Sequence, residues 1–450
     1  MNALSSNLQS NGNRNGVHGH TRISDQFRPP RRKIAALRPW LNIQTINAER
    51  HVQALRPFTR GEFGTGAALP TEAHLKAAND LIAALRPTLE TITERLEQAI
   101  LNAAQERTPA HFACVLVHKE LAHRQVQKIE QIWDFYFELF GQRQSQYGDW
   151  LLSCDRIALD CYQYIYLGLG ANKSIPSPPP FVYMRTGFSP ATFRRRVPLQ
   201  KLGKQLNPFP LIQLPYHRLI NPWALGAILH EVSHNTQNDL GLERIVPRAI
   251  ALTLLRAGCS RRVVQTWTRW NREMFADLSG VLLGGPAVVT SLMDVIGRSP
   301  RSTLKFSPGA PHPTPYLRAF LSIELLRRMG FVQEAEANRR MWKSLYPDPR
   351  YGTLPAAMLK DFEGVIALIV DAVCYQPFKT LGGKSLAQVI RFEHKEQLMI
   401  EEAARRLARG LDPGVVPARF LIGAARFALE KKLTSPEVIT RNFYSELTRR

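Results

Sequence analysis

The stretch that decides the interpretation of this sequence runs from Asn221 to His234 and reads N-P-W-A-L-G-A-I-L-H-E-V-S-H. Asn221 is a favoured N-cap residue and Pro222 a favoured first helical residue, so a helix is predicted to begin there. At about 100° per residue, His230 and His234 lie about 40° apart on one face, with Glu231 beside them. Apolar residues fill the opposite face, so this helix is expected to present two imidazoles and a carboxylate away from its core side.

Two histidines four residues apart on a helix can direct their ring nitrogens at one Zn²⁺ at about 2.0–2.1 Å. A glutamate directly after the first histidine is placed to take a proton from a water molecule on the metal. The pattern therefore predicts a zinc site with His230 and His234 as ligands and Glu231 as general base. The alternatives are a chance occurrence of the motif and a remnant that has lost its activity.

A second acidic pair follows in the stretch N-R-E-M-F-A-D-L-S-G, from Asn271 to Gly280. Glu273 and Asp277 are four residues apart and share one face of a predicted helix. We expect Glu273 to be the third protein ligand of the metal, and Asp277 to accept a hydrogen bond that orients a ligating histidine. The alternative is a solvated acidic pair, but the neighbouring residues are apolar, so an unpaired carboxylate there would be costly.

The motif H-E-V-S-H followed by E-M-F-A-D resembles the gluzincin zinc metallopeptidases, whose pattern is H-E-x-x-H and then E-x-x-x-D. The E-x-x-A-D form is similar to that of the M48 family, the Ste24- and HtpX-like peptidases. The resemblance covers about Pro215 to Gly330, a quarter of the chain, and it implies a zincin-like core. Many members of that family are embedded in membranes and this chain is not expected to be, so their membrane substrates are not carried over.

The same resemblance extends to a later His-Pro pair. In that family an arginine six residues after the histidine is common, and His312 and Arg318 have this offset. By resemblance, His312 would face the metal and stabilise an oxyanion, with Arg318 assisting. Thr314 and Pro315 are a predicted N-cap and first helical residue, which places His312 on a loop at the positive end of a helix. The alternative is a surface histidine without a role.

The rest of the chain is predicted to be mainly α, with a small β element before the first motif. Residues 1–70 are rich in Asn, Gly, Arg and Pro and are expected to form a basic, disordered tail. Helical periodicity covers residues 71–170 and 331–450, and residues 171–330 are expected to hold the catalytic core. The β-prone run from Phe209 to Leu214 is expected to pair with an extended peptide substrate by strand addition.

A second histidine pair, His118 and His123 in H-K-E-L-A-H, mimics the first motif with a spacing of five residues. On a helix this spacing points the two side chains about 140° apart. We therefore do not expect them to share a metal ion.

The charge balance is the unusual feature of the composition, because 59 Lys and Arg residues against 37 Asp and Glu give a formal net charge of +22. Such a charge attracts nucleic acid and anionic membrane surfaces. The basic tail and the cluster Arg194-Arg195-Arg196 are candidate contacts, and an arginine-rich background without any partner is the alternative. Five scattered cysteines, no visible secretory signal and no long apolar run predict a soluble, cytoplasmic protein.

These features predict a zinc metallopeptidase that holds one Zn²⁺ per chain and hydrolyses peptide or protein substrates. Two alternatives remain open. The first is a metalloprotease associated with nucleic acid and tethered by its basic tail. The second is a helical scaffold without enzymatic activity, in which the zinc is structural and a fourth protein ligand closes the site.

Overall fold

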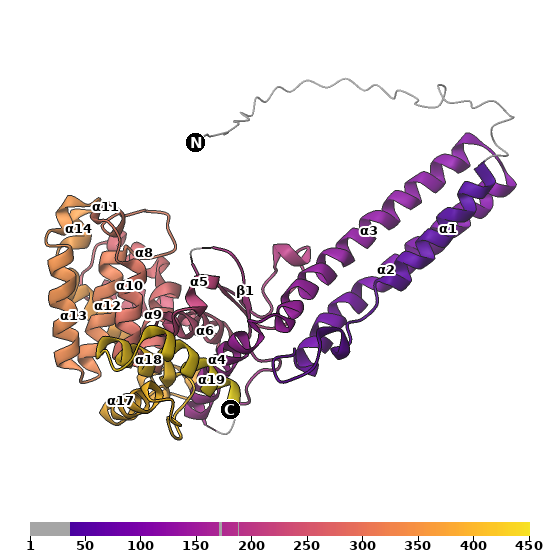
Figure 1. Cartoon of the computed structure of the whole chain (residues 1–450). Coiled ribbons are helices and arrows are strands. Elements are labelled where there is room, and N and C mark those ends of the chain that lie inside the picture. Colours follow the sequence, from indigo (N-terminus) through magenta and orange to yellow (C-terminus); the bar gives the residue numbers. More distant parts are fainter. Residues whose placement is uncertain (1–36, 171–172, 188) are drawn as a thin grey trace. The chain divides into compact units, whose positions relative to one another are not determined.

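The structure of the chain is a computed structural model, shown in Figure 1. It is mainly helical with one small sheet among the described residues, so the predicted fold class is confirmed at this level. Within the part of the chain that the structure describes, no helix combines the length and the apolar character needed to cross a bilayer. The described residues are 37–170, 173–187 and 189–450.

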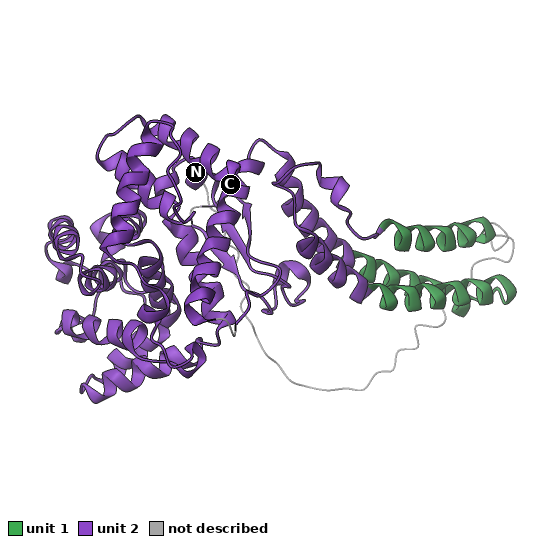
Figure 2. Ribbon diagram, turned by 90° about the horizontal axis from the view of Figure 1, so that it is seen from below, with its two compact units in different colours: residues 1–54, 86–127 green, residues 55–85, 128–450 purple. Residues whose placement is uncertain are grey.

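The chain forms two compact units, which Figure 2 colours separately. The unit boundaries fall inside two long helices, α2 (Glu72–Gln105) and α3 (Pro109–Gly141), so each helix contributes residues to both units. Of the described residues, the first unit comprises 37–54 and 86–127, and the second comprises 55–85, 128–170, 173–187 and 189–450.

The first unit contains a helix where the sequence predicts a disordered tail. The prediction for residues 1–70 is wrong over α1 (Leu37–Ala54), and residues 1–36 lie outside the described residues. Leu41, Gln44 and Ala48 recur on one face of α1 and are buried, so this face is held in a hydrophobic core with segments of α2 and α3 from the same unit. The high Asn, Gly and Pro content of residues 1–70 as a whole led to the prediction of disorder, although residues 37–54 contain this short apolar stripe.

The second unit holds the sheet and most of the helices. Its core is one continuous cluster of buried side chains that extends from α4 to the last helix. The helices are α4 (Gly148–Leu169), α5 (Tyr216–Leu219), α6 (Gly226–Asp239), α7 (Ile245–Arg256), α8 (Arg261–Arg269), α9 (Asn271–Gly284), α10 (Pro286–Ile296), α11 (Pro300–Thr303), α12 (Pro315–Arg328), α13 (Val332–Leu345), α14 (Ala356–Leu359), α15 (Phe362–Val370), α16 (Leu386–Val389), α17 (His394–Ala408), α18 (Phe420–Glu430) and α19 (Pro436–Arg449).

The sheet has three short strands in the order β1-β3-β2. β1 (Phe181–Met184) runs parallel to β3 (Leu211–Leu214), and β2 (Ala191–Phe193) runs antiparallel to β3 on its other side. The prediction that residues 209–214 pair with a substrate is therefore wrong, because both edges of β3 already carry strands. β2, which the sequence did not reveal, is an edge strand of the sheet.

Two helices of the second unit, α6 and α9, pack closely against each other. The first turn of the predicted helix at Asn221 is a 3₁₀ turn over Pro222–Ala224, and α6 begins only at Gly226. The Asn221 side chain does not cap it and donates instead to the His217 carbonyl at 3.5 Å. Gly284 lets α9 approach α6, since a Cβ atom there would lie 2.7 Å from the Leu229 side chain.

Candidate metal centre

Helix α6 presents His230 and His234 on one face, one helical turn apart. Its other side carries Ile228, Leu229 and Val232, which are buried in the core and fix the rotation of the helix. The Nε2 atoms of the two histidines lie 3.1 Å apart. Both ring nitrogens therefore point at the same position in space.

Helix α9 brings the Glu273 carboxylate to the same position. Glu273 Oε2 lies 3.5 Å from Nε2 of His230, and Oε1 lies 3.4 Å from Nε2 of His234. An ion with tetrahedral geometry and bonds of about 2.0–2.1 Å holds its ligand atoms about 3.3 Å apart. The spacing of these three residues thus fits a divalent ion of the size of Zn²⁺.

The group is limited to three protein residues. His230, His234 and Glu273 offer ligand atoms that all lie within 4.8 Å of one another. Among the described residues, no fourth histidine, cysteine, aspartate or glutamate joins them. A tetrahedral ion held here would keep one position for a ligand that is not a protein side chain.

Asp277, one turn after Glu273, holds the first histidine in place. His230 donates from Nδ1 to Asp277 Oδ1 at 2.8 Å, which leaves Nε2 directed at the other ligand atoms. Only 1% of the Asp277 side chain is exposed. The predicted contact between Asp277 and a histidine is present, and it is the contact that orients a metal-binding imidazole.

The electrostatics of the group suit a cation. Burial opposes the charged form of His230, but hydrogen bonds and charge from Asp277 and Glu273 outweigh it and raise its pKa to about 10. For His234, burial and the neighbouring His230 charge lower the pKa to about 3. Burial disfavours the Glu273 carboxylate as well, yet the hydrogen bond and charge of His230 and the charge of Arg318 hold its pKa well below the usual range. A metal ion at this position would compete with the protonation of His230.

Glu231 lies next to the ligand atoms but is not one of them. It is buried, and burial raises its pKa to about 7, although the charge on His230 opposes this shift. Its carboxylate forms no hydrogen bond or ion pair with any residue in the described ranges, and it lines the adjacent cavity. Such a carboxylate can take up or release a proton at neutral pH.

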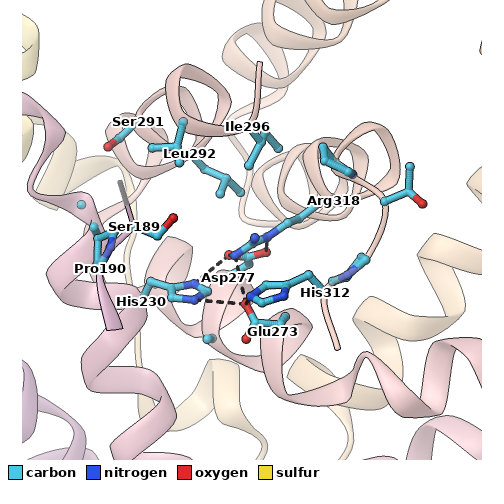
Figure 3. A pocket seen from close by; sticks show the side chains of 18 of the residues that line it. Ser189, Pro190, His230, Glu273, Asp277, Ser291, Leu292, Ile296, His312 and Arg318 are labelled. Atoms are coloured by element: carbon cyan, nitrogen blue, oxygen red, sulfur yellow. Dashed lines mark hydrogen bonds and ion pairs between the residues drawn. The ribbon is translucent and has the colours of Figure 1, made fainter. Parts of the chain in front are cut away.

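A cavity of about 450 Å³ opens beside the three candidate ligands. Ser189 and Pro190, just before β2, form one part of its wall. Leu292 and Ile296, which belong to α10, form another part (Figure 3). On α10 the lining residues recur at helical spacing, so one stripe of the helix faces the cavity. This stripe consists of Val288, Ser291, Leu292, Val295 and Ile296.

The loop before α12 and the first turns of that helix complete the centre. His312 Nε2 lies 3.3 Å from Glu273 Oε2, and 58% of its side chain is exposed. Thr314 and Pro315 begin α12 as predicted, although the Thr314 side chain makes no capping bond. His312 thus lies at the open side of the cavity, beside the carboxylate of the candidate ligand Glu273 (Figure 3).

Arg318 has a role that sequence reasoning missed. Its Nη2 donates to Asp277 Oδ1 at 2.8 Å, its Nε also donates to Asp277, and its Nη2 lies 3.4 Å from Glu273 Oε2. The guanidinium therefore holds the two acidic residues of α9. The sequence did contain an indication of this contact. An aspartate and an arginine that each lie in an apolar helix need a partner of opposite charge.

The cluster predicted to contact nucleic acid is largely used inside the protein. Arg195 is buried, and its guanidinium donates to the carbonyl groups of Ser177 at 2.7 Å and of Pro178. Arg194 forms an ion pair with Glu243. The residues 194–196 therefore do not form a free basic patch.

Comparisons of the chain with models of known protein families, with curated proteins and with solved structures found no match.

Proposed function

We propose that this protein is a zinc-dependent peptidase in which His230, His234 and Glu273 hold the ion and Glu231 is the general base. The observation that supports it best is the spacing of the three ligand atoms, 3.1–3.5 Å, beside a cavity and without a fourth protein ligand. A structural zinc site closes all four positions with protein ligands. The arrangement therefore favours a catalytic site over a helical scaffold.

When bound there, Zn²⁺ would supply Lewis acidity, lowering the pKa of water and polarising a carbonyl group. Glu231 is the residue of the chain that moves the proton. Because its pKa is raised to about 7, it can accept a proton from the attacking water and return it to the leaving amine at neutral pH.

The remaining residues position the others or contact the substrate. Asp277 keeps the Nδ1 proton on His230, and Arg318 fixes Asp277 and Glu273. His312, at the open side of the cavity, is placed to donate a hydrogen bond to the oxygen of the carbonyl group under attack. We assign catalytic contact to Glu231 and His312 and a positioning role to Arg318.

The resemblance of H-E-V-S-H and E-M-F-A-D to the gluzincin metallopeptidases supports the same reaction, and with it a zincin-like core in residues 171–330. A peptide substrate would lie in the cavity between α9 and α10. β2 replaces β3 as the strand that could pair with an extended peptide, since β2 has a free edge and follows the cavity residues Ser189 and Pro190.

The proposal is tested by the metal content of the purified protein, measured by mass spectrometry for the wild type and for Glu273→Ala. We expect one zinc per chain in the wild type and loss of most of it in the variant. Glu334→Ala, at an exposed glutamate of α13, is the control and should keep its zinc. A wild-type protein that binds no divalent ion, or a Glu273→Ala protein that binds it unchanged, would refute the ligand assignment.

A further inference from the structure

Helices α7 and α8 carry a concentration of positive charge that the proposed peptidase function does not use. Residues 244–272 contain seven arginines and no aspartate or glutamate. Every one of these arginines is exposed. They are Arg244, Arg248, Arg256, Arg261, Arg262, Arg269 and Arg272.

Most of this charge is not neutralised within the protein. Arg272 lies 3.7 Å from Glu243, and Arg269 donates to the Pro308 carbonyl. The guanidinium groups of the other five form no ion pair or hydrogen bond with the residues that the structure describes. Asp361 is a carboxylate near the turn between the two helices, where burial and, to a smaller extent, the charge of Asp361 raise the pKa of Cys259.

The arginines of α17 contrast with those of α7 and α8. In α17, Arg405 and Arg406 both pair with Glu402 on the same helix. The arginines of α7 and α8 therefore lack the acidic partners on the same helix that those of α17 have.

Exposed leucines lie among these arginines. Leu252 and Leu255 are 53% and 54% exposed, on the same outer stripe of α7 as Arg248 and Arg256. The opposite side of α7 is buried through residues that include Ile250, so this orientation is fixed by the core. The outer stripe thus carries both cationic and large apolar side chains.

We propose that this α7–α8 face binds an anionic lipid surface. Guanidinium groups would contact lipid phosphates, while Leu252 and Leu255 would enter the boundary between head groups and acyl chains. A nucleic-acid backbone would satisfy the arginines but would offer no apolar environment to the leucines, so the leucines favour lipid. The binding is peripheral, and it does not depend on the proposed peptidase function.

The face adjoins a wall of the metal-centre cavity. Trp270, directly after α8, donates from Nε1 to the Ala310 carbonyl at 3.2 Å, and Ala310 lines the cavity. Arg269 contacts the same loop at Pro308. Binding through α7 and α8 would therefore bring the loop that carries His312 close to the lipid surface.

The test is co-sedimentation of the full chain with vesicles of phosphatidylcholine, either pure or with phosphatidylglycerol added. We expect binding only to the anionic vesicles, and at least tenfold weaker binding for Arg248→Glu/Arg256→Glu. The matched control is Arg409→Glu/Arg441→Glu, two exposed arginines of which one directly follows α17 and the other lies in α19, and it changes the net charge equally. Should the glutamate pair fail to fold, Arg248→Gln/Arg256→Gln is the substitute, with a smaller loss expected.

The uncharged pair Leu252→Ser/Leu255→Ser separates lipid from nucleic acid. It should weaken vesicle binding while leaving the net charge unchanged. Equal losses in the α7 pair and the control pair would overturn the proposal, because binding would then follow net charge alone. Unchanged vesicle binding in the leucine variant, or tighter binding to duplex DNA that is lost with Arg248 and Arg256, would overturn it as well.

Discussion

The chain contains two segments of nearly the same composition, H-E-V-S-H at His230 and H-K-E-L-A-H at His118, and only the first forms a candidate metal centre. In the first, the two Nε2 atoms lie 3.1 Å apart. In the second, His118 Nδ1 is buried without a hydrogen-bond partner among the described residues, and the His123 ring contacts His51 instead. One additional residue in the spacing separates the two imidazoles on the helix.

Spacing is not the whole difference. The His230 segment also faces a second helix that supplies Glu273 as a candidate ligand and Asp277 as a hydrogen-bond acceptor. The His118 segment has an acidic residue, Glu120, but this side chain pairs with Arg124 on the surface of the same helix. A metal centre thus needs both the local spacing and a carboxylate from a separate helix.

The largest expected effect is the loss of the metal on removal of a ligand. His234→Ala should leave two of the three protein ligands and reduce the zinc content of the purified protein from one per chain to near zero. His123→Ala is the matched control from the second segment and should retain the metal. If both variants kept their zinc, the ion would lie elsewhere in the protein.

The second prediction concerns the glutamates of the two segments. Glu231→Gln should keep the zinc but lower kcat for peptide hydrolysis about 10²–10⁴-fold, since the general base is lost. Glu120→Gln should leave both the zinc content and the turnover unchanged. Hydrolysis at the wild-type rate by Glu231→Gln would contradict the assignment of the base.

A smaller effect is expected from the residue that orients His230. Asp277→Asn should weaken zinc affinity about 10–100-fold in competition titrations with a chelator, because the acceptor of the Nδ1 proton loses its charge. The control is Asp371→Asn. This carboxylate pairs with Arg328, and neither residue lines the cavity beside the candidate ligands. Equal affinity in the two variants would show that Asp277 is only a structural ion-pair partner.

The smallest effect concerns a buried histidine outside both segments. His74 donates from Nε2 to the Pro179 carbonyl at 3.0 Å, and burial lowers its pKa to about 4. Its contribution to stability is fully present above the unfolded pKa of about 6.5 and is lost as the pH falls towards 4, because only the unfolded chain takes up the proton. Denaturant titrations should show a loss of about 1 kcal/mol from this residue between pH 7.5 and pH 5.5.

His74→Gln removes the titrating group and should reduce that pH dependence by the same amount. An unchanged dependence in this variant would assign the acid sensitivity to other residues.

The sequence predicted which side chains of the candidate centre share a helix face, because local geometry decides this. The four-residue spacing places His230 and His234 on one face, and the apolar surroundings of Glu273 and Asp277 indicated that these carboxylates have partners inside the protein. These inferences need only helical periodicity and the cost of burying a charge.

The sequence predicted less where contacts between distant segments decide the structure. Nothing local shows that Arg318 binds Asp277, that β3 lies between two strands, or that α1 packs on α2 and α3. β2 has only three residues, which is too short for an alternating pattern to stand out. In each case the position is fixed by partners that lie far away in the chain.

The most direct test of the central claim is X-ray absorption spectroscopy at the zinc edge of the metal-loaded full chain. Convergence of His230, His234 and Glu273 predicts two imidazole nitrogens, one carboxylate and one exchangeable water oxygen around the ion. A coordination shell with four protein ligands, or one that is unchanged in Glu273→Ala, would contradict it.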